Sequence, residues 1–187
     1  IPDLAAACAD ADLFGINARL EELRDRLMVI APPPQPFDVV MANARALMVC
    51  RAPDSTQTVL ARFGPAPGRQ RRDWLLLSWQ AASAAFDHSR ASLALRRLAN
   101  GNLTALDFEQ LTVGYGEDGL PLTRSALDLL VEHEISQGRS SEAVIVLLAG
   151  RARGTLGARR LALAAELLHD LGSDQHSTIL ESALDQA

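Results

Sequence analysis

Hydrophobic residues in the first thirty positions recur at alternating intervals of three and four. They are Leu13, Ile16, Leu20, Leu23, Leu27 and Ile30. This is the a/d spacing of a coiled-coil seam, and it predicts a helical arm over residues 1–30, in which 1–12 form a separate short helix or a frayed end. Two hypotheses fit the seam: self-association of two copies, or packing of the arm against its own chain.

A proline-rich stretch, APPPQPF, follows at 31–37. Proline lacks the amide donor of a helix and restricts the residue before it, so the first helix must end here. We therefore expect an N-terminal helical arm at 1–30, a linker at 31–37 and a helical-repeat domain at 38–187.

The remainder of the chain shows mainly helical patterns. Helices are predicted over 39–50, 69–86 and 87–99. Thr104 with Asp107 resembles a capping box, and Thr123 can cap a later helix. The sequence GYGEDG (114–119) then reads as a loop between helices. Alanine and leucine, both strong helix formers, supply about a third of the chain. The fold class that we predict is all-α.

Glycines divide the second half at nearly regular intervals. They are Gly101, Gly119, Gly138, Gly154 and Gly172, placed 18, 19, 16 and 18 residues apart. Each can supply the left-handed residue that ends a helix. Two such units make a period of 34, which also relates Leu127 to Leu161 and Ile145 to Ile179. An antiparallel array of helical hairpins has this organisation.

Two segments resemble the middle of a tetratricopeptide repeat: EISQGRSSEAVIVLLAGRA (134–152) and, one period later, LLHDLGSDQHSTILESAL (167–184). A weaker echo lies at 95–111. Ser177 stands where the repeat expects a small alanine, and its usual aromatic positions hold leucine or polar residues. The resemblance covers about a third of the chain, mainly 123–187. It implies a degenerate α-solenoid or irregular bundle whose groove binds a segment of another protein.

All 18 basic residues are arginine, against 23 acidic residues and a net charge of −5. Without lysine, no Schiff base with pyridoxal phosphate or an aldol substrate can form, and a Walker A loop is excluded. The acidic balance and the lack of a basic stripe also argue against nucleic acid as a partner.

Arginines cluster at three places within predicted helices. The candidate partner-binding residues are Arg69, Arg71, Arg72, Arg96, Arg97, Arg159 and Arg160. The planar guanidinium suits two-pronged contacts with carboxylates, so these arginines fit an acidic segment of a partner. The alternative is an ordinary solvated helix face. Trp74 and Trp79 are expected to anchor the core beside the first cluster.

The sequence AVIVLLAGRARGTLG (143–157) supports a second hypothesis. A buried strand running into Gly150, Gly154 and Gly157 would form a phosphate-binding loop, and nearby arginines would add charge. Against this, the glycine spacing is G-x3-G-x2-G, and the same residues fit the 34-residue period. Helix is the reading that we favour, and a ligand bearing phosphate is the alternative.

No catalytic triad, metal or cofactor site can be assigned. Cys8 and Cys50 lack a metal or redox spacing and are expected to be small buried hydrophobic residues. Glu132, His133 and Glu134 are contiguous, so they diverge around a helix and are expected on a solvated face. The longest apolar run is far too short to span a membrane, and a cytoplasmic location is the default expectation.

The function expected from the sequence is that of a non-enzymatic interaction module: an adaptor, chaperone or assembly factor. Its groove would take a partner helix or an extended acidic segment, and the N-terminal helix could join two copies. The alternative is an enzyme or regulator that binds a phosphate-bearing ligand at Gly150–Gly157.

Overall fold

The computed structural model describes residues 1–30, 32–64, 68–172, 178, 179 and 181. These residues are mainly helical, with one two-stranded sheet. The chain divides into two compact units, Ile1–Asp87 (unit 1) and His88–Ala187 (unit 2). The predicted arm at 1–30 lies in unit 1 together with the helices that follow the proline-rich stretch.

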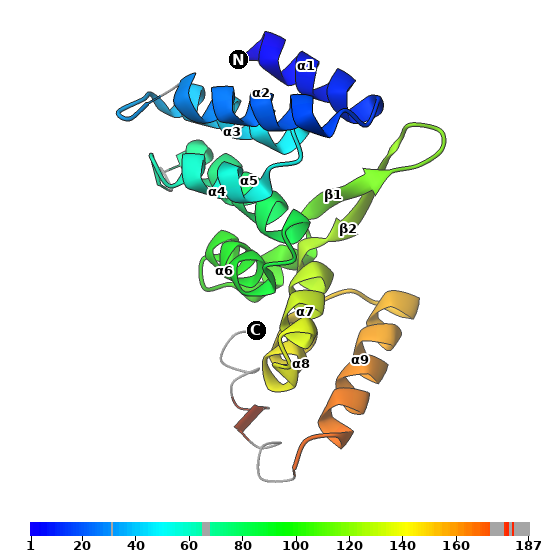
Figure 1. The fold of residues 1–187 in the computed structure, drawn as a ribbon. Helices are drawn as coiled ribbons and strands as arrows, with labels where there is room; N and C mark the ends of the chain where they lie inside the picture. Colours follow the sequence, from blue (N-terminus) through cyan, green and yellow to red (C-terminus); the bar gives the residue numbers. More distant parts are fainter. Residues whose placement is uncertain (31, 65–67, 173–177, 180, 182–187) are drawn as a thin grey trace. The chain divides into compact units, whose positions relative to one another are not determined.

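Unit 1 consists of helices that pack around α3 (Figure 1). They are α1 (Pro2–Leu13), α2 (Asn17–Ile30), α3 (Phe37–Val49), α4 (Pro53–Leu60) and α5 (Gly68–Ala84). Trp74 and Trp79 of α5 are buried, as expected of core anchors, and the indole nitrogen of Trp74 donates to the carbonyl of Leu60 at 3.1 Å.

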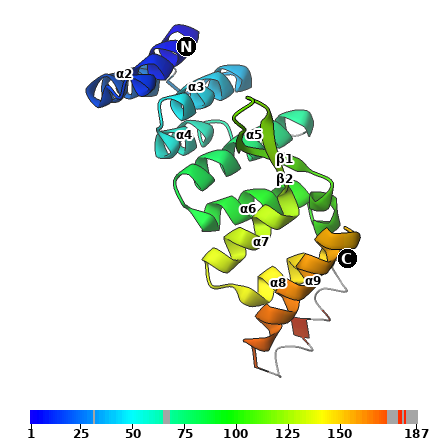
Figure 2. The ribbon, with the colours of Figure 1, turned by 90° about the vertical axis from the view of Figure 1, so that its right-hand side faces the viewer.

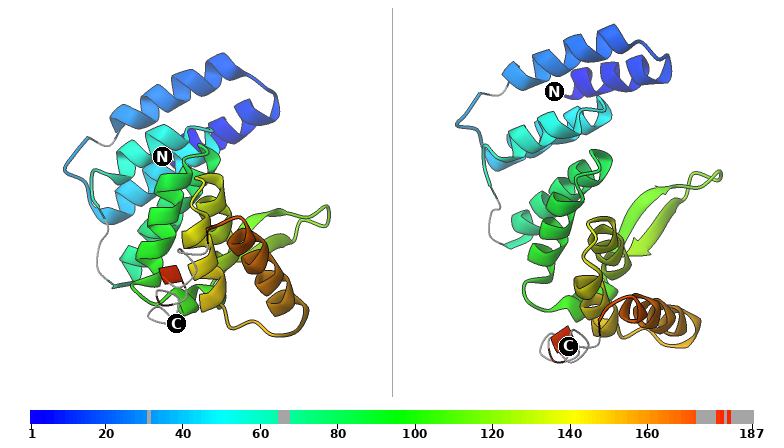
Figure 3. Two further views of the ribbon diagram at one scale, coloured as in Figure 1. Left: turned by 90° about the horizontal axis from the view of Figure 1, so that it is seen from below. Right: turned by 60° about the horizontal axis from the view of Figure 1, so that its bottom comes forward.

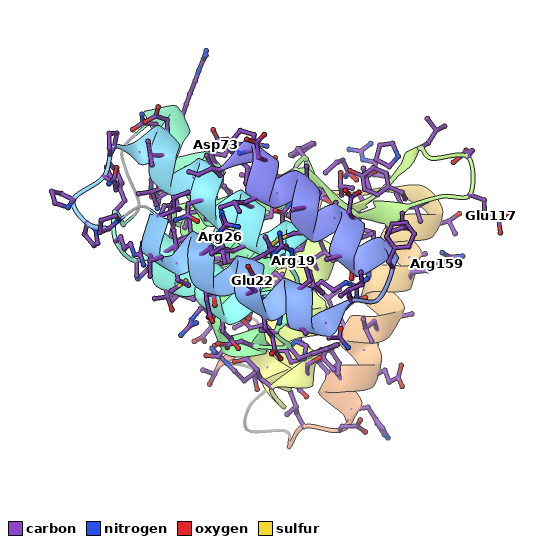
Figure 4. The ribbon with its side chains drawn as sticks, turned by 45° about the horizontal axis from the view of Figure 1, so that its top comes forward. Arg19, Glu22, Arg26, Asp73, Glu117 and Arg159 are labelled. Atoms are coloured by element: carbon purple, nitrogen blue, oxygen red, sulfur yellow. A yellow bond between two sulfur atoms is a disulfide. The ribbon has the colours of Figure 1, made fainter. Side chains whose placement is uncertain are left out.

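The predicted heptad seam is not one continuous helix, because Leu13 ends α1, Ile16 lies in the turn, and only the other four residues lie in α2. Leu20, Leu23 and Leu27 are buried within unit 1, and α2 contacts α1, α3 and α4. The remaining seam residues, Leu13, Ile16 and Ile30, are exposed. The middle of the seam therefore packs on its own chain. On the outer face of α2, Arg19 and Glu22 pair at 2.6 Å (Figure 4).

The two cysteines are joined in a disulfide, which the sequence analysis did not predict. Cys8 of α1 and Cys50, directly after α3, are both fully buried and their Cα atoms lie 4.9 Å apart. Both are buried, as expected, and the packing of α1 on α3 brings them together.

Unit 2 begins with α6 (His88–Ala99) and the short 3-10 helix η1 (Leu103–Asp107). A β-hairpin follows, made of β1 (Gln110–Tyr115) and β2 (Pro121–Ser125), and then α7 (Ala126–Ser136), α8 (Ser140–Ala149) and α9 (Gly154–His169). Each helix from α6 to α9 packs on the next along the chain (Figure 2). Leu127, Leu130 and Val144 are among the buried residues between them.

The hairpin replaces a helix that the sequence analysis predicted. Thr104 and Asp107 lie in η1 rather than in a capping box, so the weak repeat echo at 95–111 is not a pair of helices. The sequence GYGEDG forms the end of β1 and the turn to β2, where Gly119 has a φ of 76°. Thr123 lies in β2, and the helix cap is Ser125, whose hydroxyl accepts from the amide of Leu127 at 3.2 Å.

The segment most similar to a tetratricopeptide repeat is a helix–turn–helix. Gly138, with a φ of 72°, turns the chain between α7 and α8. Residues 143–149 lie in α8, which confirms the helical reading of that apolar run. The period of 34 does not carry through to packing, because Leu127 is buried whereas Leu161 is 62% exposed. Residues 173–177, 180 and 182–184 of the second segment lie outside the described residues.

Candidate interaction surface

Large apolar side chains gather on and beside the β-hairpin of unit 2. Each is between 46% and 76% exposed: Phe108, Val113, Tyr115, Leu120 and Leu122. Isolated exposed leucines are ordinary on proteins, but a local concentration of apolar side chains marks a surface that another molecule can cover. We call these five residues the hairpin surface.

Both faces of the hairpin contribute to this surface. The antiparallel register pairs Tyr115 with Pro121 and Gly114 with Leu122. Adjacent pairs point to opposite faces of a sheet, so Tyr115 and Leu122 project in opposite directions. The hairpin extends away from the helices of unit 2 in Figure 3, and its buried side chains, Leu111 and Ser125, lie at the base.

The base of the hairpin is tied to α7. The amide of Ala126 donates to the carbonyl of Glu109 at 2.8 Å, which closes the hairpin where β2 runs into the helix. Arg124 of β2 makes a two-pronged ion pair with Glu132 of α7, with one contact of 2.9 Å. Both contacts lie near one end of the hairpin. Among the described residues, its distal part shows no comparable hydrogen bond or ion pair to a helix.

A buried arginine strengthens the same base from α9. Arg160 is 5% exposed, and its Nε lies 2.8 Å from Oδ1 of Asp128 in α7. Its Nη1 lies 2.7 Å from Oδ1 of Asp107, and its Nη2 contacts the hydroxyl of Ser125 at 3.4 Å. One guanidinium thus joins η1, the end of β2, α7 and α9. Paired this way, a buried charge holds the elements around it in one arrangement.

Asp107 occupies the place that the phosphate hypothesis gave to a ligand. Its carboxylate accepts from the backbone amides of Arg151 and Ala152 at 2.7 and 3.0 Å. Burial works to raise the pKa of Asp107, but the hydrogen bond from Arg160 and those two amides hold it below its usual value. The amides before α9 are therefore already bonded to an anion of the same chain.

Close packing explains two of the three glycines in that loop. A Cβ at Gly150 would lie 2.8 Å from Nη1 of Arg160, and a Cβ at Gly157 would clash with the carbonyl of Ala152. The preceding segment is α8, not a strand. The strand that the phosphate hypothesis places before Gly150–Gly157 is therefore absent, and two amides of the loop, those of Arg151 and Ala152, are bonded to Asp107.

The predicted partner-binding arginines differ in burial and in their contacts. Arg160 is buried, which corrects its assignment as a surface contact. Arg96 binds the buried Glu134 at 2.9 Å and Glu142 at 2.8 Å, so its carboxylate partners come from its own unit. Arg71 is half-buried, and the exposed members are Arg69, Arg72, Arg97 and Arg159. Arg159 lies on the outer side of α9 (Figure 4).

The expectation of a solvated face at His133 and Glu134 was also wrong. Both are buried where α7 faces α6, and Nδ1 of His133 lies 3.0 Å from Nδ1 of His88. Burial lowers the pKa of His133, and the charge of His88 lowers it further. Glu134 lies between Arg96 and Arg139, the latter at 3.2 Å. These groups hold α6, α7 and the turn to α8 together.

Comparison with known proteins gives no guide to the function of this chain. No protein family, curated protein or solved structure matches the chain. Within the described ranges, no helix is long and apolar enough to cross a membrane, and no group of three or more potential metal ligands converges.

The sequence analysis missed the hairpin surface, although one signal was present. The stretch LTVGYGEDGLPLT has β-branched residues and a tyrosine before a glycine-rich acidic turn and a threonine after it, which is a hairpin pattern. The neighbouring helix signals, Thr104 with Asp107 above all, favoured the wrong reading.

Proposed function

We propose that the chain is a non-enzymatic protein-interaction module that contacts its partner through the hairpin surface. The observation that carries this proposal is the exposure of five large apolar side chains on and beside a hairpin whose base is fixed by the Arg160 and Arg124 ion pairs. A rigid base keeps the contact residues in place before binding, which lowers the entropic cost of association.

The proposal keeps the class of function expected from the sequence and changes the contact site. The earlier expectation placed a partner in a helical groove lined by arginines, yet Arg96 and Arg160 bind carboxylates of their own chain. The resemblance of α7 and α8 to a tetratricopeptide repeat supports an interaction role, because that family binds protein segments. It supplies no particular partner.

Site-specific crosslinking tests the proposal. A photoreactive amino acid placed at Tyr115 should give a discrete crosslinked species in cells that carry the gene, identified by mass spectrometry. The same group at Val29, an equally exposed apolar position on α2, is the matched control. The double variant Tyr115→Ser/Leu122→Ser should reduce recovery of that partner, while Val29→Ser should not.

Thermal unfolding of both variants shows whether they remain folded. Since all three positions are exposed, each variant should unfold within a few degrees of wild type, that is, within about 0.5 kcal/mol for a surface substitution. Crosslinking that is equal at Tyr115 and Val29, or partner recovery unchanged by the double variant, would contradict the proposal.

A further inference from the structure

The two strands of the hairpin differ in how well their outer edges are protected. Among the described residues the sheet consists of β1 and β2 alone, so each strand has one edge without a strand partner there. β2 begins at Pro121, carries the charged Arg124 and packs against α7. Proline and charge are two of the features that protect an edge against added strands, and a β-bulge is a third.

β1 lacks the first two of these protections. Its sequence, QLTVGY, has no proline and no charged residue, and Thr, Val and Tyr favour extended structure. Gln110, Thr112, Val113 and Tyr115 are all exposed. The register shifts between Thr112 and Gly114, so a strand added to this edge must follow a locally increased twist. An isolated two-stranded hairpin is also marginal in water, and a third strand would stabilise it.

We infer that a partner binds as an extended strand along the outer edge of β1. This rests on the proposed function and specifies the partner's chemistry. Backbone hydrogen bonds to β1 would supply affinity, as in strand addition to other sheet edges. The side chains next to the added strand are those of β1, of which Thr112, Val113 and Tyr115 are exposed, so the added strand carries apolar or β-branched side chains opposite them.

The negative charge around the turn specifies the charge at one end of the partner strand. Glu117 and Asp118 directly follow β1, both are exposed, and Glu117 points away from the hairpin turn (Figure 4). Residues 110–120 contain no basic residue. The partner strand therefore carries lysine or arginine at the end that lies beside the turn. A second copy of this chain that paired through its own β1 would bring no lysine or arginine to the turn, because residues 110–120 contain neither, so it is not the occupant.

Selection from a displayed library of random twelve-residue peptides tests this inference. Peptides are selected on the wild-type chain and counter-selected on Tyr115→Ser/Leu122→Ser. The expected winners contain a run of β-branched or aromatic residues with lysine or arginine at one end. They should bind the charge-reversed variant Glu117→Lys/Asp118→Lys about tenfold more weakly than wild type.

Hydrogen exchange locates the bound peptide. With a selected peptide, amides of β1 should become protected while those of α9 do not change. Peptides that depend on the hairpin but lack a basic end, bind the charge-reversed variant equally well, or protect α9 instead of β1 would overturn this inference and leave the proposed function standing. If no selected peptide distinguishes wild type from the double serine variant, the proposed function itself fails. Concentration-dependent dimerisation lost in that variant would make a second copy the occupant.

Discussion

Asp107 and Arg160 form an ion pair in the interior of unit 2, with 2.7 Å between Oδ1 and Nη1. Their side chains are 7% and 5% exposed. Because Asp128 shares the same guanidinium, the pair links the end of η1 to α7 and α9, and so fixes the base from which the hairpin leaves the helices. The stability of this base is therefore a condition for any function of the hairpin.

Replacing the buried arginine should destabilise unit 2 strongly. The substitution Arg160→Gln leaves the carboxylates of Asp107 and Asp128 without their cation, and loss of one partner of a buried ion pair costs about 3–5 kcal/mol. The exposed neighbour gives a matched control, since Arg159→Gln should change the free energy of unfolding by about 0.5 kcal/mol or less. Denaturant unfolding followed by circular dichroism measures both. Equal effects of the two substitutions would show that the pair does not stabilise the fold.

The histidine pair between α6 and α7 predicts weaker folding in mild acid. The pKa of His133 in the folded chain is lowered from its ordinary value of 6.5, first by burial and then by His88. As the pH falls through 6.5, the unfolded chain takes up a proton at His133 that the folded chain does not. The free energy of unfolding should therefore decrease with falling pH, until folded His133 is itself protonated.

Denaturant unfolding at a series of pH values between about 7.5 and 5 checks this prediction. His133→Gln should remove much of the pH dependence in that range, whereas His169→Gln, an exposed position at the end of α9, should leave it in place. A pH dependence that survives His133→Gln unchanged would assign the effect to other groups.

Periodicity was enough to predict the helices but not the strands. Apolar spacing located α2, α3, α5 and α6, because each buries one side against a neighbour. The continuous apolar run of α8 was read as a helix from the 34-residue period instead. The hairpin could not be found in this way, since most of its side chains are exposed on both faces and no alternation of buried and exposed residues marks it. Composition gave the signal instead, with β-branched residues around a glycine-rich turn.

The ion pairs of the arginines could not be predicted from any local sequence pattern. Arg159 and Arg160 are adjacent, and neighbours on a helix diverge by about 100°, so one can be buried while the other is exposed. The sequence does not show that Arg160 turns inward, because its partners Asp107 and Asp128 are distant along the chain. Cys8 and Cys50 were missed for the same reason.

The disulfide of unit 1 should contribute substantially to its stability. It links residues 42 positions apart, and closing a loop of that length in the unfolded chain corresponds to about 4 kcal/mol. Unfolding with and without a thiol reductant should show a loss of this order, and Cys8→Ala/Cys50→Ala should unfold alike in both conditions. Titration of thiols in the unfolded, unreduced protein should find none. Two reactive thiols there would mean that the bond does not form.

Some residues of the heptad seam are buried and others are exposed, so the role of the seam in stability and its role in self-association can be tested separately. Leu23 is fully buried, so Leu23→Ala should lower the free energy of unfolding by about 2–5 kcal/mol. Leu13 and Ile16 are exposed, so Leu13→Ser/Ile16→Ser should leave stability nearly unchanged, and any association of two copies through the arm should be lost. Sedimentation equilibrium over a range of concentrations measures the mass of each. If wild type is a monomer at every concentration, the seam serves only the core of unit 1, and the self-association hypothesis is wrong.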